Sequence, residues 1–139
     1  MSFARQATAV GIAGRALLIE GPPGIGKSSL ALALIDRGAG LIGDDGVLLE
    51  AVDGRLLASP PPRIAGKLEV RNLGLLDFPT LGGVPVALVV RLDPAAERFI
   101  DAAQSIELAG ATLPLIALWP HAPVLPLRAE LALERYGLR

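Results

Sequence analysis

One stretch constrains the fold of this chain more than any other: a glycine-rich segment between an apolar segment and a helix-forming one. Residues 21–28 read GPPGIGKS and match the G-x-x-x-x-G-K-[ST] pattern of a phosphate-binding loop. Residues 16–19 form an apolar strand that runs into the loop, and residues 27–37 are strong helix formers that end at Gly38. Strand, loop and helix in this order are the setting that the motif requires. The segment therefore predicts an α/β fold with a nucleotide site.

The residues of this loop have distinct expected roles on a nucleotide. Glycines let successive backbone N–H groups point at one place. Lys27 would reach the β- and γ-phosphates, and the Ser28 hydroxyl would ligate Mg²⁺. We expect the side chain of Lys27 to project into solvent when no nucleotide is bound. The predicted nucleotide-binding residues are Gly21, Pro22, Pro23, Gly24, Ile25, Gly26, Lys27, Ser28 and Ser29.

Composition argues against several other classes of protein. The chain has 139 residues, which suits one domain over residues 1–139, and 52% of them are hydrophobic. The net charge is −1 and there is no basic run, which argues against nucleic acid or a membrane surface as partner. No apolar stretch reaches the ~18 residues of a membrane span. The lack of cysteine excludes disulfides and fits a cytoplasmic protein.

Short apolar segments separated by turn signals make up the rest of the chain. This pattern favours a mixed, hairpin-rich sheet with flanking helices over a fully parallel sheet. Two hairpins are predicted, one around residues 52–54 and one around residues 109–111. The expected strands are residues 3–12, 16–20, 40–45, 47–51, 55–58, 67–71, 84–92, 106–108 and 112–119, the expected helices are 27–37, 94–103 and 127–136, and residues 72–83 are expected to form a loop.

Carboxylates outside the loop are candidates for the chemistry. Asp44 and Asp45 end the first expected strand after the phosphate-loop helix, residues 40–45. In a β-loop-α-β unit the end of that strand returns beside the loop, which places at least one of the pair near the γ-phosphate. Without the loop, the pair would read as an acidic turn that opens a hairpin. Adjacent residues on a strand point to opposite sides, so we expect the two aspartates to have different roles.

Glu69 and Arg71 form a second candidate pair. The two residues share one face of their expected strand, because side chains on a strand alternate with a period of two. They read either as an ion pair at the surface or as a metal ligand beside a phosphate contact, and composition does not decide between these readings.

Several of these segments together resemble the catalytic domain of HPr kinase/phosphorylase. The resemblance rests on the phosphate loop, on Asp36-Arg37-Gly38, on residues 41–45 (LIGDD) and on residues 68–74 (LEVRNLG). It covers most of residues 6–92. The phosphate loop is common to many families, whereas the two aspartates and the LEVRNLG stretch are far more specific together. More narrowly, the chain resembles the form in which the catalytic domain stands alone.

The resemblance implies a function. Members of the family are ATP-dependent protein-serine kinases that phosphorylate HPr, a small phosphocarrier protein of the sugar phosphotransferase system. Many members also reverse the reaction by phosphorolysis. ATP and Mg²⁺ are therefore the implied cofactors, and an HPr-like carrier is the implied partner. The resemblance leaves a homo-oligomer open, because the catalytic domains of the family assemble into hexamers.

The resemblance also implies roles for individual residues. Lys27 would contact the nucleotide phosphates, while Ser28 and Glu69 would hold Mg²⁺. Asp45 would take the proton from the acceptor serine. Arg98 is the nearest match to a catalytic arginine of the family, and it reads equally well as part of a solvated helix face. The predicted catalytic residues are Asp45, Asp44, Lys27 and Arg98.

The chain departs from the family at positions that affect activity. Gln6 stands where the family has a catalytic histidine, and an amide does not titrate. Position 72 is Asn rather than Gly, and residues 119–123 contain no arginine where the family has an arginine-rich loop. His121, the only histidine, reads as a surface loop residue rather than a catalyst. These departures weigh more against phosphorolysis than against kinase activity.

Two alternative functions stay open. The first is a nucleotide-sensing regulatory module that binds ATP or ADP and a partner with little or no transfer, which Gln6 and the missing arginines favour. The second is a P-loop kinase for a small metabolite. The lack of a segment with several arginines, which would serve as a lid, counts against the second.

Overall fold

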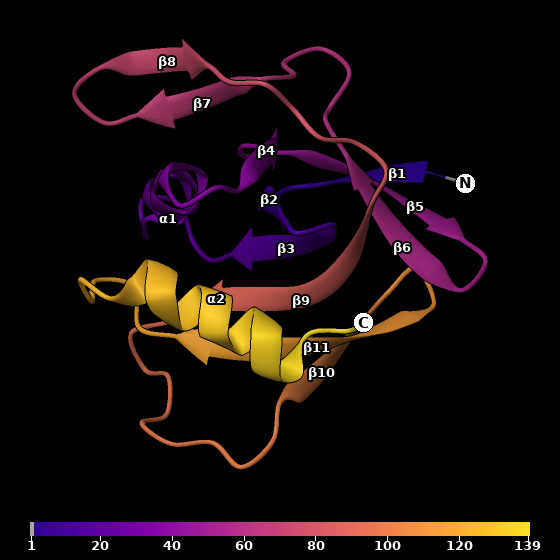
Figure 1. Cartoon of the computed structure of the whole chain (residues 1–139), viewed down its shortest axis with the longest axis vertical. Helices are drawn as coiled ribbons and strands as arrows, with labels where there is room; N and C mark the ends of the chain where they lie inside the picture. Colours follow the sequence, from indigo (N-terminus) through magenta and orange to yellow (C-terminus); the bar gives the residue numbers. More distant parts are fainter. Residues whose placement is uncertain (1) are drawn as a thin grey trace.

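The computed structural model describes residues 2–139 and shows a curled mixed sheet with two helices (Figure 1). The strands are β1 (Ser2–Arg5), β2 (Thr8–Ile12), β3 (Arg15–Glu20), β4 (Gly40–Gly43), β5 (Val47–Val52), β6 (Arg55–Ser59), β7 (Lys67–Val70), β8 (Gly74–Asp77), β9 (Val84–Leu92), β10 (Gln104–Leu108) and β11 (Ala111–Leu118), and the helices are α1 (Lys27–Asp36) and α2 (Leu125–Tyr136). The main sheet has the order β1-β5-β6-β9-β3-β2-β4, with β11 on β9 and β10 on β11. The predicted mixed, hairpin-rich α/β fold is confirmed.

The directions of the strands bring the carboxyl ends of four strands to one edge of the sheet. β9 pairs with β6 at its start, and further along it lies between β3 and β11 and is parallel to both. β2 is antiparallel to both β3 and β4, so β4 also runs with β3. In open α/β sheets, ligands bind in the crevice outside the carboxyl ends of the strands. The segments that follow β3, β4, β9 and β11 are therefore the expected site.

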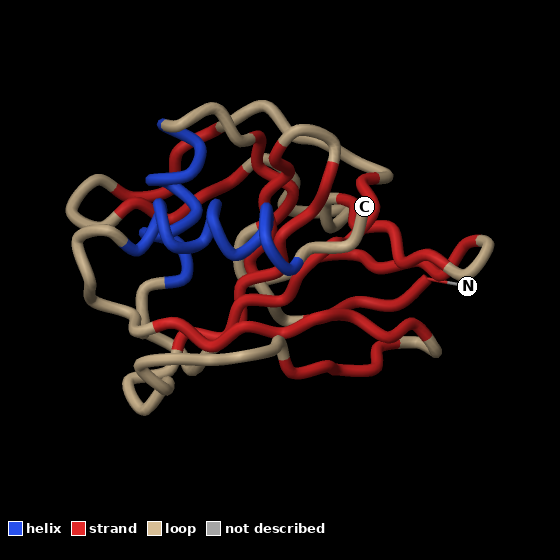
Figure 2. The backbone as a smooth tube through the Cα atoms, turned by 60° about the horizontal axis from the view of Figure 1, so that its bottom comes forward, coloured by secondary structure: helices blue, strands red, loops and turns tan. Residues whose placement is uncertain are grey.

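Buried aliphatic side chains form a core on each face of the sheet. On one face lie the two helices α1 and α2 (Figure 2). They pack on the sheet through residues such as Leu34 and Leu133. On the other face, β5 and β6 fold over β3, where Leu18 and Leu49 are fully buried. Both helices thus lie on the same face, next to the edge at which β3 ends. Neither helix among residues 2–139 is long and apolar enough to cross a membrane.

The two predicted hairpins are confirmed, and both use the same turn chemistry. β5 and β6 are joined by Asp53 and Gly54, with φ of 50° and 78°. Ala109 and Gly110 join β10 and β11 with φ of 51° and 81°. Two successive residues with positive φ match the right-handed twist of the flanking strands. This requirement explains why a glycine occupies the second place of each turn.

Three expectations about the elements are wrong. Residues 3–12 do not form one strand, because the chain leaves the sheet at Gln6 and Ala7, so that β1 pairs with β5 while β2 pairs with β3 and β4. The expected loop at residues 72–83 contains β8, which pairs antiparallel with β7 through a turn at Asn72, where φ is 73°. The turn brings β8 directly alongside β7, so the backbone groups of β8 find hydrogen-bond partners on β7. The glycines within residues 72–83, which favoured a loop, do not prevent this pairing.

The third wrong expectation is the helix at residues 94–103. Asp93 starts a turn there, with its carboxylate accepting the Ala95 N–H at 2.8 Å and its carbonyl accepting the Ala96 N–H at 3.1 Å. The turn does not continue into a helix. Phe99 is 81% exposed and Ile100 is 43% exposed. The segment therefore has no buried apolar face, which is what stabilises most short helices in proteins.

Candidate active site

The phosphate loop connects the end of β3 to the start of α1. Gly26 precedes the helix with a φ of 112°, which residues with a side chain rarely adopt. A Cβ atom at Gly21 would lie 2.8 Å from Ile25 Cγ2. In the described chain no side chain caps the first turn of α1. Its free N–H groups therefore remain available to an anion such as a phosphate group.

Lys27 lies across its own loop rather than projecting into solvent, and that expectation is wrong. Its Nζ donates to the Gly21 carbonyl oxygen at 2.6 Å and to the Pro22 carbonyl oxygen at 3.2 Å. An ammonium group has three donors, and two of them are used by these loop carbonyls. The side chain is thereby held over the place where the loop would bind a phosphate.

Asp44 connects three segments that are far apart in the sequence. Its Oδ1 accepts the Ser28 hydroxyl at 2.6 Å and the Thr8 hydroxyl at 3.1 Å, and its Oδ2 accepts the Glu69 N–H at 3.1 Å. A side chain at Gly43 would collide with the Gly46 carbonyl oxygen, so glycine is needed where the chain turns into the aspartates. Asp44 therefore joins α1, β2 and β7 at the end of β4.

Asp45 is more exposed than Asp44 and has different neighbours. Its Oδ1 accepts the Gln6 side-chain amide at 3.4 Å, and its N–H donates to the Thr8 hydroxyl at 3.4 Å. The two aspartates follow β4 instead of lying on it, and Asp45 has a φ of 59°. Their side chains have different partners, and a left-handed turn at Asp45 takes the place of the strand pleat that was expected between them.

Thr8 is a residue of this site that the sequence analysis missed. It is fully buried and contacts both aspartates. Its spacing from Gln6 could have indicated that it belongs to the site. Residues two positions apart on an extended chain have their side chains on the same side, and Gln6 stands at a position where the family has a catalytic residue.

The site residues surround one polar cleft of about 210 Å³. Glu69 and Arg71 both lie on it, and β7 is anchored beneath them by the fully buried Leu68. The position of the pair fits a metal ligand beside a phosphate contact better than an isolated ion pair at the surface. The cleft is lined by Thr8, Pro23, Gly24, Gly26, Lys27, Ser28, Ser29, Asp44, Asp45, Glu69 and Arg71.

The oxygen atoms in this cleft are of the kind that Mg²⁺ prefers. Among residues 2–139, no cluster of three or more His, Asp or Glu side chains could hold an ion by itself. Mg²⁺ usually keeps several waters and is bound by one or two carboxylates together with substrate phosphates. The Ser28 hydroxyl, next to the carboxylates of Asp44 and Glu69, fits that demand.

Arg98 is not brought together with the other predicted catalytic residues. It lines a separate cleft of about 490 Å³ with Phe99, Trp119 and Arg128. Its guanidinium carbon lies 5.5 Å from the centre of the Phe99 ring. This cleft lies beside β11 and α2, and none of the phosphate-loop residues contributes to it.

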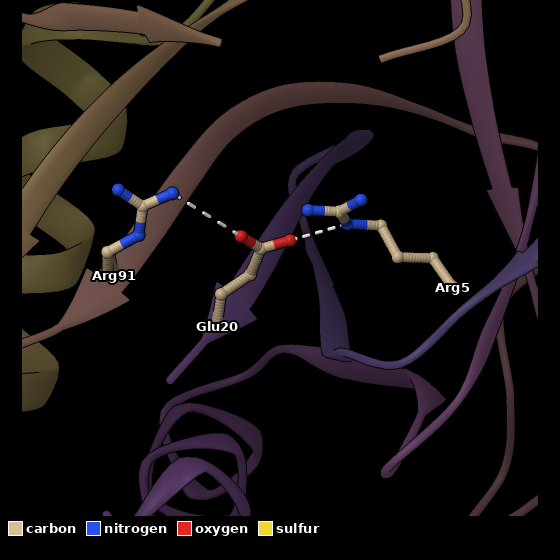
Figure 3. A network of polar contacts seen from close by, with 3 residues as sticks. All are labelled: Arg5, Glu20 and Arg91. Carbon is tan, nitrogen blue, oxygen red and sulfur yellow. Dashed lines mark hydrogen bonds and ion pairs between the residues drawn. The ribbon is translucent and has the colours of Figure 1, made fainter. Parts of the chain in front are cut away.

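A buried carboxylate connects the strands at the entrance to the phosphate loop (Figure 3). Glu20 is 9% exposed and directly precedes Gly21. Its Oε2 accepts the Arg5 Nε–H at 2.5 Å, and its Oε1 lies 3.9 Å from Arg91 Nη2. Because Arg5 directly precedes Gln6, the network joins the start of the phosphate loop to the segment beside Asp45.

Comparison with known proteins identifies the family. The family described as HPr Serine kinase C-terminal domain matches residues 2–93, which is more than half of the chain. The chain belongs to this family. The match includes β1, the phosphate loop, both aspartates and β7.

Individual HPr kinases are similar over the same region. The HPr kinase/phosphorylase of Clostridium tetani is 44% identical over 82 residues, which cover 59% of this chain and 27% of that protein. The HPr kinase/phosphorylase of Clostridium beijerinckii is 47% identical over 75 residues, covering 54% of this chain and 25% of that protein. The matched segment thus spans about a quarter of the length of these relatives.

A solved HPr kinase structure has the same fold. The HPr(Ser) kinase/phosphatase from Coxiella burnetii superposes with a TM-score of 0.84 at 28% identity. The superposition covers 95% of this chain and 88% of the other. The similarity in structure therefore extends past residue 93, beyond the part that the family match covers.

Proposed function

We propose that this chain is an ATP-dependent protein-serine kinase of the HPr kinase type, acting on an HPr-like phosphocarrier protein. One observation carries the proposal: the phosphate loop, both aspartates and Glu69 line a single cleft. Membership of the HPr Serine kinase family supports the same substrate class. The proposal places ATP and the acceptor serine at this cleft.

Five residues of the cleft have roles in the proposal. Lys27 exchanges its loop carbonyls for the β- and γ-phosphates. Ser28 and Glu69 hold Mg²⁺, which when bound neutralises developing charge on the phosphates. Asp44 orients the Ser28 hydroxyl, and Asp45 acts as the general base. Arg98 has no role here, because it lines a different cleft.

In the proposed reaction, Asp45 accepts the proton of the acceptor serine hydroxyl. The serine oxygen forms a bond to the γ-phosphorus of ATP, and the bond from that phosphorus to the β–γ bridging oxygen breaks. ADP leaves with the electron pair of the broken bond, and the carrier becomes a phosphoserine protein. Positioning and charge stabilisation supply most of the acceleration in phosphoryl transfer.

The decisive experiment incubates the pure protein with γ-labelled ATP, Mg²⁺ and an HPr-like protein whose serine is intact. We expect label on the carrier and none on a carrier with that serine changed to alanine. ATP binding without label transfer would instead support a nucleotide-sensing module. Loss of ATP only when a small metabolite is added would support a metabolite kinase.

The sensing module is the second candidate, and two observations favour it. Gln6, which donates a hydrogen bond to Asp45, has no titratable proton to exchange with that carboxylate. Arg98 lies outside the cleft that contains the phosphate loop. These features leave nucleotide binding intact and affect only the transfer step.

The reverse reaction is proposed to be weak. Phosphorolysis needs inorganic phosphate held beside the phosphoserine, and arginine is suited to that task. Residues 119–123 contain no arginine, and position 6 is not a histidine. Incubating phosphorylated carrier with millimolar inorganic phosphate tests this point, and rapid release of pyrophosphate would contradict it.

A further inference from the structure

A second cleft lies on the other side of the phosphate loop. It has a volume of about 430 Å³ and shares Gly24, Gly26, Ser29 and Arg71 with the polar cleft. Its size falls within the range of ligand sites in proteins, about 300–1,000 Å³. The remaining lining residues are Ile25, Leu30, Ala33, Pro120, His121, Ala122, Leu125 and Pro126.

The chemistry of this second cleft differs from that of the first. Its floor is apolar, with Leu30 and Leu125 no more than 5% exposed and Pro120 buried. Its lining includes no carboxylate, whereas Asp44, Asp45 and Glu69 line the first cleft. Its charged or titratable side chains are Arg71, at the boundary with the first cleft, and His121.

The topology of the sheet creates this cleft. The segment after β11 reaches the edge at which β3 ends, because the two strands run parallel on either side of β9. A turn in which the Leu125 N–H donates to the Ala122 carbonyl at 3.0 Å leads the segment into α2. Pro120 and His121 are thereby held opposite Ile25 and the first turns of α1.

The phosphate loop fixes which way a bound nucleotide must point. Lys27 lies on the first cleft and not on the second, and in phosphate loops this lysine reaches the β- and γ-phosphates. The terminal phosphate therefore faces the aspartates. The α-phosphate and the nucleoside then leave the loop in the opposite direction, toward the apolar cleft.

We propose that the cleft formed by Ile25, Leu30, Pro120, His121 and Leu125 binds the nucleoside half of ATP, with the His121 imidazole against the face of the base. The inference rests on the proposed function, since it assumes a nucleotide on the phosphate loop. Arg71, which lies on both clefts, contacts the nucleotide where its phosphates meet its ribose. This assigns a role to the single histidine of the chain.

The test compares ATP with inorganic tripolyphosphate, each with Mg²⁺, in calorimetric titrations of the whole chain. Tripolyphosphate carries the phosphates without the nucleoside. In the wild-type protein we expect ATP to bind at least tenfold more tightly than tripolyphosphate. We expect His121→Ala to lower the affinity for ATP by about 5- to 10-fold, which is the lower part of the range for a base stacked on an aromatic ring. Tripolyphosphate binding should stay unchanged.

Two further variants make the result specific to the cleft. Ala33 lies on α1 and lines the cleft, so Ala33→Leu places a larger side chain inside it. Leucine is a good helix former, so α1 should be kept. This variant should lower the affinity for ATP but not the affinity for tripolyphosphate. Val124→Ala changes an exposed residue three positions after His121 that does not line the cleft, and it should affect neither ligand.

The outcomes separate this inference from the proposed function. Equal affinity of the wild-type protein for ATP and tripolyphosphate would overturn the nucleoside site and leave the phosphate loop in place. Unchanged ATP affinity in both His121→Ala and Ala33→Leu would also overturn it. If the wild-type protein bound neither ligand, the proposed function would fail first.

Discussion

Asp44 and Asp45 are adjacent in the chain, but their surroundings differ. Asp44 accepts three hydrogen bonds, from Ser28, Thr8 and Glu69. Asp45 is exposed, and among residues 2–139 its side chain has one hydrogen-bond partner, Gln6, at 3.4 Å. A general base must be free to approach a substrate hydroxyl. Asp45 meets that condition, whereas Asp44 is engaged with the loop and β7.

The first prediction is that Asp45→Asn abolishes transfer and leaves ATP binding largely intact. General-base assistance contributes roughly 10²–10⁴-fold in rate, and the amide cannot accept the proton. The substitution is nearly isosteric, so the turn should keep its shape. Single-turnover transfer at saturating ATP measures the effect, and Asp53→Asn in the β5–β6 turn is the matched control. Transfer within about threefold of wild type, well below that range, would move the catalytic role elsewhere.

The second prediction concerns Asp44→Asn and the metal. The amide keeps one acceptor oxygen and replaces the other with an NH₂ group, so it can accept from Ser28 or from Glu69 but no longer from both. We expect ATP affinity with Mg²⁺ to fall by about tenfold or more, because hydrogen bonds to charged groups contribute roughly 1.5–3 kcal/mol. Without the metal, affinity should be unchanged or slightly higher, since a negative charge near the phosphates is gone. Titrations with ATP in the presence of Mg²⁺ and in the presence of a chelator measure the two affinities. An equal loss of ATP affinity with and without Mg²⁺ would count against a role of Asp44 in positioning the metal ligands.

The third prediction concerns Lys27→Ala. Lys27 forms hydrogen bonds to two loop carbonyls in the free protein and would transfer them to phosphates. We expect ATP·Mg²⁺ affinity to fall about 10- to 100-fold, using roughly 1.5–3 kcal/mol per charged hydrogen bond. The control is Lys67→Ala, whose ammonium pairs with Asp77 outside the cleft. Unchanged affinity in Lys27→Ala would refute the assignment of the phosphate loop.

At the scale of elements, the β7–β8 hairpin presents Glu69 and Arg71 to the cleft while belonging to a separate small sheet. Leu68 is fully buried in the core beneath α1 and anchors the hairpin. Leu75, on β8, is 68% exposed. Leu68 is therefore the fully buried anchor of the cleft residues, and the partly buried Val70 packs against the same core.

The fourth prediction follows from that anchoring. Leu68→Ala should lower the free energy of unfolding by about 2–5 kcal/mol, the range for removing a buried leucine side chain. It should also weaken ATP binding, because Glu69 and Arg71 lose their support. Leu75 lies one position from the residue that pairs with Leu68. Leu75→Ala should change the free energy of unfolding by no more than about 0.5 kcal/mol. Urea denaturation measures both, and similar costs for the two variants would show that Leu68 is not the anchor.

At the scale of the whole molecule, Glu20 joins strands from three distant parts of the chain (Figure 3). It lies on β3, Arg5 on β1 and Arg91 on β9. The curl of the sheet brings β1 back to the end of β3, although the two strands are not neighbours in the strand order. The network thus closes the curled sheet at the edge that carries the phosphate loop.

The fifth prediction distinguishes the two arginines. Arg5 donates a hydrogen bond of 2.5 Å to a buried carboxylate, so Arg5→Ala should lower the free energy of unfolding by about 1.5–3 kcal/mol. Arg91 lies 3.9 Å from the same group and is 44% exposed, so Arg91→Ala should cost about 0–1 kcal/mol. Thermal or urea unfolding measures both variants. A larger cost for Arg91→Ala would reverse this order and contradict the network as described.

Features that depend on neighbouring residues could be read from the amino-acid sequence. The phosphate loop, the helix that follows it and the hairpin turns at residues 53–54 and 109–110 could be predicted because glycines and turn residues act over a few positions. The approach of at least one of the two aspartates to the loop could be predicted because the β-loop-α-β unit is itself a local motif, and Asp44 is the one that contacts Ser28.

Features that depend on residues far apart in the sequence became visible in the folded chain. The split between β1 and β2 follows from their pairing with different strands, and the loss of helix at residues 94–103 follows from the lack of a surface to bury it. The contacts of Thr8 with the two aspartates join residues about 36 positions apart in the sequence. The apolar cleft needs the end of β11 beside Ile25. These contacts are set by how the sheet curls and packs, which short-range propensity does not encode.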